Sequence, residues 1–193
     1  MRTLFAILTA CALLFVGSAG QAAEIGLQAM EVRLGLADLE GGGGSSFIFS
    51  AAADLGRLTP DLGLELNADF WTKSWGQDYG YLGSSYNYDW TWTNIAFLGH
   101  LRYDFARDGG GFRPYAYGGL GLHYWSVSWD CTGCSAYGWD FDETGLEIGF
   151  DVGVAAEFGD GSGMTPVARA GFNTNGGADY LYIQGGLRFP IGR

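Results

Sequence analysis

The chain has 193 residues and a formal net charge of −11, with 34 glycines, 4 prolines and 16% aromatic residues. An apolar fraction of 48% excludes a disordered chain. The acidity disfavours nucleic acid, which binds basic faces, and it equally disfavours an anionic lipid surface as an electrostatic partner.

The first 23 residues have the organisation of an export signal. Arg2 supplies a positive charge, residues 4–16 are almost continuously apolar, and residues 17–23 are small and polar. Cleavage after Ala22 or Ala23 fits the small-residue rule. A lipoprotein box ending at Cys11 is the alternative, but the apolar run continues beyond it. We expect a cleaved signal over 1–23 and a single domain over 24–193.

Alternation with period two dominates the chain after residue 24 and predicts strands rather than helices. No apolar run long enough for a transmembrane helix follows the signal. Short breaks (58–61, 106–113, 159–164) alternate with intermediate or long ones (38–45, 73–90, 128–143, 174–178). Short periplasmic turns opposite longer outer loops are typical of bacterial outer-membrane barrels. Eight strands are expected at 25–37, 46–57, 62–72, 91–105, 114–127, 144–158, 165–173 and 179–189.

In nearly every expected strand one face is apolar and the other carries glycine and charged residues. A soluble sandwich or a lipocalin-like ligand carrier would show the same alternation, with the apolar faces meeting in a core. The mixed charges and glycines of the polar face favour a narrow enclosed interior instead. Aromatic residues near the strand ends favour interfacial girdles; they are Phe47, Phe70, Trp71, Trp92, Phe105, Tyr124, Phe158, Phe172 and Phe189.

The sequence therefore predicts an all-β protein, an eight-stranded antiparallel up-and-down transmembrane β-barrel. In lipid an unpaired sheet edge is costly, so the first and eighth strands should pair and close the barrel.

The strand that begins Arg113-Pro114-Tyr115-Ala116-Tyr117-Gly118-Gly119 resembles the small outer-membrane β-barrel superfamily. That superfamily includes the transmembrane domain of outer membrane protein A and the OmpX and OmpW types. In this family the last strand ends in an aromatic residue that the barrel-assembly machinery reads. Gln184, Gly186, Leu187 and Phe189 resemble that signal, followed here by the tail 190–193. The resemblance implies the bacterial outer membrane as location and the assembly machinery as partner.

Charged residues on the polar face are candidates for a network that fills the barrel interior. An eight-stranded barrel is only wide enough for side chains, so charges inside it must pair. A narrow pore or an OmpW-type channel for small solutes is the alternative. His100 and His123 could hold a metal only with a third ligand, so we expect neither a metal nor a cofactor. The expected network comprises Glu31, Arg33, Glu65, Asp69, His100, Arg102, Glu147, Asp151, Arg169 and Arg188.

The longest breaks carry candidate contact residues and a pair of cysteines. Cys131 and Cys134 can form a loop-stapling disulfide or a redox couple, and their acidic neighbours favour the disulfide. Tyrosine and tryptophan among serine, glycine and asparagine resemble a binding surface. The alternative is that the strands continue beyond the membrane and pair these rings across strands. The candidates are Trp75, Tyr79, Tyr81, Tyr86, Tyr88, Trp90, Trp129 and Trp139.

We expect a structural or adhesion-like surface role for a monomer in contact with outer-membrane lipid and lipopolysaccharide. Lipid A deacylases on small barrels carry a late His-x-Ser-Asn stretch. The late stretch here, residues 172–177, has no histidine, so no enzyme is expected.

Overall fold

The computed structural model describes residues 24–40, 44–81, 84–105, 111–132, 141–159, 163–175, 177 and 179–191. The side chains of residues 24, 78–81, 84–86, 132 and 141 are outside this description. The expected signal over 1–23 also lies outside it. Within the described residues, no helix has the length and apolar character needed to cross a membrane.

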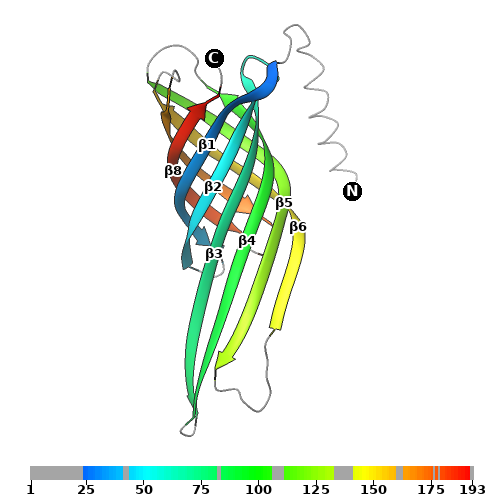
Figure 1. Cartoon of the computed structure of the whole chain (residues 1–193), viewed down its shortest axis with the longest axis vertical. Coiled ribbons are helices and arrows are strands. Elements are labelled where there is room, and N and C mark those ends of the chain that lie inside the picture. The colour runs from blue at the N-terminus through cyan, green and yellow to red at the C-terminus, as the bar shows by residue number, and fades with distance from the viewer. Residues whose placement is uncertain are drawn as a thin grey trace.

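Eight antiparallel strands form one closed sheet in which each strand pairs with the next and β1 pairs with β8 (Figure 1). The expected up-and-down barrel and its closure are confirmed. β1 begins and β8 ends at one end of the barrel, called here the turn end. The strands are β1 (Glu24–Leu39), β2 (Gly44–Arg57), β3 (Leu62–Tyr81), β4 (Ser84–Asp104), β5 (Phe112–Thr132), β6 (Phe141–Phe158), β7 (Thr165–Thr174) and β8 (Tyr180–Pro190).

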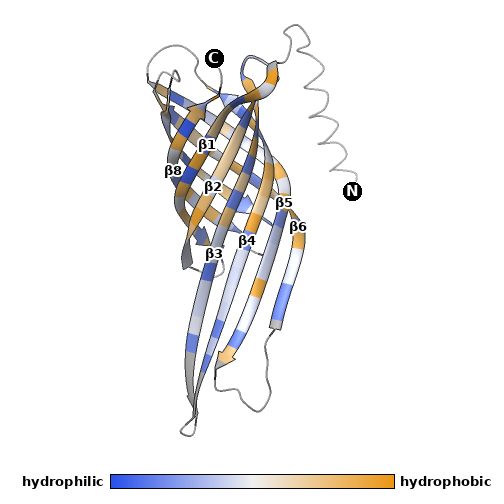
Figure 2. Ribbon diagram, viewed as in Figure 1, coloured by the Kyte–Doolittle hydropathy of each residue, from blue (hydrophilic) through white to orange (hydrophobic). Residues whose placement is uncertain are grey.

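The polar and apolar faces are arranged as the alternation predicts, with charges inside and apolar side chains outside. Figure 2 shows hydrophilic and hydrophobic residues following one another along the strands. Phe97, Ile148 and Ile183 are 64%, 76% and 64% exposed on the outer wall. Glu65 and Asp151, from the opposite faces of their strands, are 3% and 0% exposed. A shared apolar core, which a soluble barrel or sandwich requires, would reverse these values.

The strand bounds differ most from expectation in β3 to β6, which run far beyond the other four. The pairing of β2 with β3 ends at Ile48↔Trp71, whereas β3 and β4 pair as far as Tyr81↔Ser84. The described parts of the expected outer loops at 73–90 and 128–143, residues 73–81, 84–90, 128–132 and 141–143, are therefore strand. Figure 1 shows these strands continuing beyond the barrel, and residues 72–81, 84–93, 126–132 and 141–144 are called the protruding sheet.

Cross-strand pairs explain why this polar, glycine-containing segment stays extended. The hydroxyls of Thr72 and Thr93 lie 3.1 Å apart, and those of Ser74 and Thr91 lie 2.8 Å apart. Such pairs stabilise antiparallel neighbours. Composition alone suggests loops here, but the alternation that marks the membrane strands also continues through this region.

Candidate functional site: the barrel interior and the protruding sheet

A ring of ion pairs fills the turn end of the barrel. Arg102 donates to Asp104 at 2.7 Å and to Glu157 at 2.5 Å, and its guanidinium stacks 3.8 Å above the ring of Tyr115. Glu157 also accepts from Arg113 at 2.6 Å. Because almost all of these groups are buried, each charge depends on its partners inside the barrel. Arg188, paired with Asp54, and Arg57, 2.6 Å from Asp104, complete the ring.

Arg33 organises one side of the middle of the barrel. Its guanidinium donates to Glu31, to Asn67 and, at 3.1 Å, to Gln184. Gln184 in turn donates to the hydroxyl of Ser50 at 2.5 Å. The group links β1, β2, β3 and β8 across the interior, so it holds the seam where the first and last strands close.

Arg169 organises the other side. It donates to Glu65 at 2.8 Å and lies 3.0 Å from Nδ1 of His100, and its guanidinium stacks 3.5 Å above the ring of Tyr117. Nε2 of His100 lies 3.0 Å from Asp151. His100 is thus held between two carboxylates and a guanidinium, with no exposed surface. This arrangement suits a structural bridge between strands β3, β4, β6 and β7.

Glycine on neighbouring strands makes room for these large side chains. A Cβ at Gly171 would lie 2.7 Å from the hydroxyl of Tyr182, and one at Gly153 would lie 2.5 Å from Cζ of Tyr117. Tyr182 uses the space to donate to Asp151 at 2.9 Å. The many glycines on the polar face therefore match large residues opposite them, as expected of a narrow interior.

An aromatic layer lies above the ion pairs, toward the protruding sheet. Trp71 is fully buried and meets Tyr180 edge-on at 5.8 Å between ring centroids and Trp92 at 6.0 Å. Ile48 and Leu39 complete the layer. The expected placement of Trp71 and Trp92 in the outer girdle is wrong, because both continue the inward-facing positions of their strands. The remaining girdle residues lie on the outer wall, with Phe172 half-buried there.

The structure brings most of the expected network residues into contact but leaves some apart. Asp69 is buried among the interior residues, whereas Glu147 is only half-buried and faces His123 across the β5–β6 pair. His100 and His123 do not share a partner in the described contacts. No group of three or more His, Cys, Asp or Glu residues in the described ranges could hold a metal ion. Contributors that the expected network omitted are Ser50, Asp54, Arg57, Asn67, Asp104, Arg113, Tyr115, Tyr117, Glu157, Tyr182 and Gln184.

The protruding sheet has two chemically different faces. Trp75, Trp90 and Trp129 are aligned across β3, β4 and β5 on the face that continues the barrel interior. The rings of Trp90 and Trp129 stack 5.3 Å apart. The opposite face carries the hydroxyl pairs and short acidic residues. Within the described residues all the tryptophans lie on the first face or its continuation into the barrel: Trp71, Trp75, Trp90, Trp92, Trp125 and Trp129.

The expected contact residues are divided by this arrangement. Trp75, Trp90 and Tyr88 are half-buried, and Trp129 is 48% exposed. The side chains of Tyr79, Tyr81, Tyr86 and Trp139 lie outside the described residues. Cys131, at the end of β5, is disulfide-bonded. Cys134 lies outside the described residues, so the pairing between the two cysteines stays a prediction.

Solved structures share this fold. Neisserial surface protein A superposes with a TM-score of 0.55 and 18% identity, covering 84% of this chain and 96% of that one. A major outer membrane protein from Thermus thermophilus gives 0.56 and 13%, covering 84% and 98%. The N-terminal β-barrel domain of Pseudomonas aeruginosa OprF gives 0.50 and 14%, covering 86% and 99%. No protein-family model matches the chain, and no curated protein matches it in sequence. The expected resemblance to small outer-membrane barrels is confirmed for the fold.

Proposed function

We propose that this chain is a monomeric outer-membrane protein with a filled interior, and that its protruding sheet is a surface for contact with other molecules. The outer wall supports the membrane location, because large apolar side chains cover it while charges are paired inside. In water on all sides, this inside-out arrangement would be unfavourable, because it leaves large apolar side chains in contact with the solvent.

The filled interior supports a role other than conduction. Ion pairs occupy the turn end and the middle, and Trp71 and Tyr180, both with no exposed surface, cross the interior above them. A solute would have to displace the aromatic layer and then break buried charge pairs. The proposal therefore includes neither a channel nor a catalytic step.

The observation that carries the proposed contact role is the aromatic face of the protruding sheet. Tryptophan is enriched at interaction hot spots because a rigid ring buries a large area at little entropic cost. Trp129 is nearly half exposed there and stacks on Trp90. β4 and β5, which carry these two rings, also form part of the barrel wall. The sheet is therefore anchored rather than suspended on loops.

A matched pair of variants tests the contact role. Detergent-refolded protein is applied to arrays of extracellular-matrix proteins and glycans, and each bound component is titrated. We expect Trp129→Ser to weaken binding by about tenfold or more, as loss of a hot-spot residue does. Ser128→Ala, one residue away on the opposite face, should bind like the unmodified chain. Equal affinities for both variants, or no binding by the unmodified chain, would contradict the proposed contact role.

Two further measurements test the proposed membrane location and the proposed filled interior. Refolded barrels should migrate differently on gels before and after boiling and should fractionate with detergent. Planar bilayers containing the protein should lack steady channels. Recovery in the aqueous phase without detergent would instead support the soluble carrier, and steady conductance would support the pore.

A further inference from the structure

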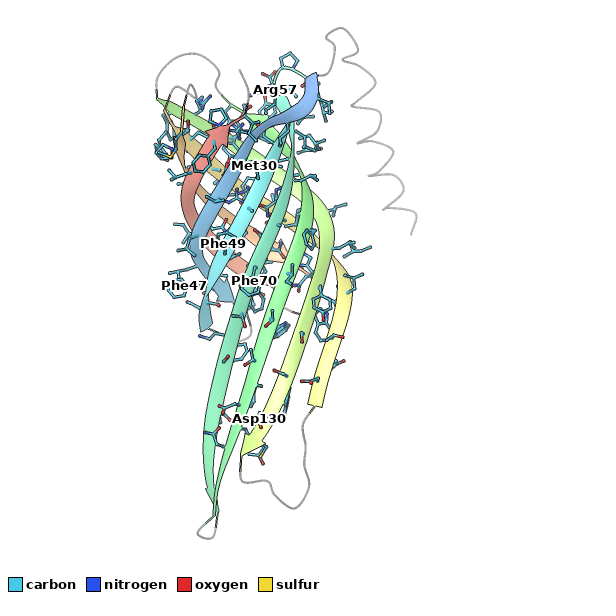
Figure 3. All side chains as sticks on the ribbon, in the orientation of Figure 1. Met30, Phe47, Phe49, Arg57, Phe70 and Asp130 are labelled. Atoms are coloured by element: carbon cyan, nitrogen blue, oxygen red, sulfur yellow. The ribbon has the colours of Figure 1, made fainter. Side chains whose placement is uncertain are left out.

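A groove of about 440 Å³ lies on the outer wall where β1 and β2 reach their far ends beside β3. Its volume falls in the range of sites that hold small molecules. Figure 3 shows Phe47 and Phe49 on β2 and Phe70 on the neighbouring β3 at this level. Leu34 and Leu36 on β1 complete its apolar wall.

The end of the groove next to the protruding sheet is polar. Ser45, Thr72, Ser74 and Lys73 line it. Lys73 is the only lysine in the chain. Its ammonium donates to the backbone carbonyl of Ser45 at 2.8 Å. An ammonium has three N–H donors, so this bond leaves capacity for an anion.

Lys73 is also the only cation at this end among the described residues. Arg33 and Arg169 are buried in the interior, and the other described arginines lie at the turn end. Lys73 forms no ion pair within the described part of the chain. The exposed charged residues around this end are acids, Asp38, Glu40, Asp89, Asp130, Asp142 and Glu143. This surface repels anions in general, so an anion held here needs a specific site.

We propose that the groove binds lipid A, with one acyl chain between Phe47, Phe49 and Phe70 and a phosphate at Lys73. The inference rests on the proposed outer-membrane location, which places the groove in the outer leaflet, where lipopolysaccharide is the lipid. An apolar groove on a lipid-facing wall fits an acyl chain. A cation at its polar end fits a phosphate, and nearby hydroxyls can add hydrogen bonds to the phosphate oxygens.

Titration of bisphosphorylated lipid A into the refolded full barrel in detergent, followed by native mass spectrometry, tests the assignment. We expect Lys73→Gln to weaken lipid A binding about tenfold, since it removes one charge-assisted contact. Dephosphorylated lipid A should bind the unmodified barrel weakly and be insensitive to Lys73→Gln. Phe49→Ala should weaken binding of both lipids, because it acts on the acyl chain.

Two control variants leave the groove intact. Arg57→Gln removes a cation at the turn end, and Phe97→Ala removes an exposed outer-wall ring on β4; both should bind lipid A like the unmodified chain. Gel mobility before and after boiling establishes that each variant is folded. Equal binding by Lys73→Gln and the unmodified barrel would overturn the site. Phosphatidylglycerol binding as tightly as lipid A, with the same dependence on Lys73, would assign the groove to phospholipid and overturn the assignment to lipid A. If the barrel itself failed to fold in detergent, the membrane location would fail rather than this site alone.

Discussion

Replacing Arg169 with methionine tests whether the barrel interior is dry. The side chain is 2% exposed, donates to Glu65 at 2.8 Å and stacks on Tyr117 at 3.5 Å. Methionine keeps a long, unbranched side chain at this position and removes the positive charge. Glu65 would then keep His100 as its remaining close partner among the described contacts.

The expected loss follows from leaving a buried carboxylate without its main cation. Breaking a buried ion pair from one side costs about 3–5 kcal/mol. In a water-filled interior the same pair would be screened, and its loss would cost about 0–1 kcal/mol. The two descriptions of the interior thus differ by several kcal/mol for a single substitution.

Equilibrium unfolding in urea with phospholipid vesicles measures this difference through tryptophan fluorescence. Arg57→Gln is the matched control, because its side chain is 47% exposed at the turn end, and we expect it to cost less than about 1 kcal/mol. Adding Glu65→Gln to Arg169→Met should recover part of the loss, since the carboxylate that lost its cation is then neutral. If Arg169→Met costs no more than Arg57→Gln, the interior is hydrated and the filled-barrel description is wrong.

Three other predictions concern packing, the lipid face and the disulfide. Gly171→Ala should lower the free energy of unfolding by about 1–3 kcal/mol, because the added methyl group would overlap the hydroxyl of Tyr182. Gly185→Ala, where a Cβ would meet nothing within 4 Å, should cost much less in the same assay. Phe97→Arg should reduce folding into vesicles, because an arginine near the bilayer midplane costs about 2–4 kcal/mol of folding free energy. Ser128→Arg, on the protruding sheet, should fold like the unmodified chain. Equal folded fractions of the two variants on gels would refute a lipid-facing Phe97. Reduction of the bond at Cys131 should add two hydrogens by mass and leave the unfolding midpoint of the barrel unchanged, because opening there is local.

Alternation along the strands is sufficient to predict the barrel because it determines which face each residue occupies. These strands have leucine or phenylalanine at every second position and charged residues between them. In lipid, one arrangement suits both kinds of residue: the apolar side chains face the lipid and the charged side chains face the interior. The strand ends in β3 to β6 are harder to predict. Serine, glycine and asparagine suit both loops and exposed strands, and cross-strand partners such as Thr72 and Thr93 are visible only after the register is known.

The interior is predictable in composition but not in its pairings. Alternation places Glu65 and Arg169 on the same face, yet they are 104 residues apart, so nothing local in the sequence links them. Residue type favours the girdle for Trp71, because aromatic residues at strand ends are common there. Its position two residues after Asp69 continues the inward face and indicates the correct placement. The alternation of inward and outward positions along the strand thus predicts the placement of a side chain better than its residue type does.

Strand length provides a further argument for a surface role. β4 and β5 each have 21 residues, which corresponds to about 70 Å of extended chain. At a tilt of about 40° this spans roughly 53 Å, twice the roughly 25 Å apolar band of such barrels. The connections at the turn end are short, so most of the excess lies beyond the opposite end, as the protruding sheet. Ring contacts such as Trp90 on Trp129, and paired hydroxyls on the other face, hold that excess as a paired sheet with one aromatic and one polar face.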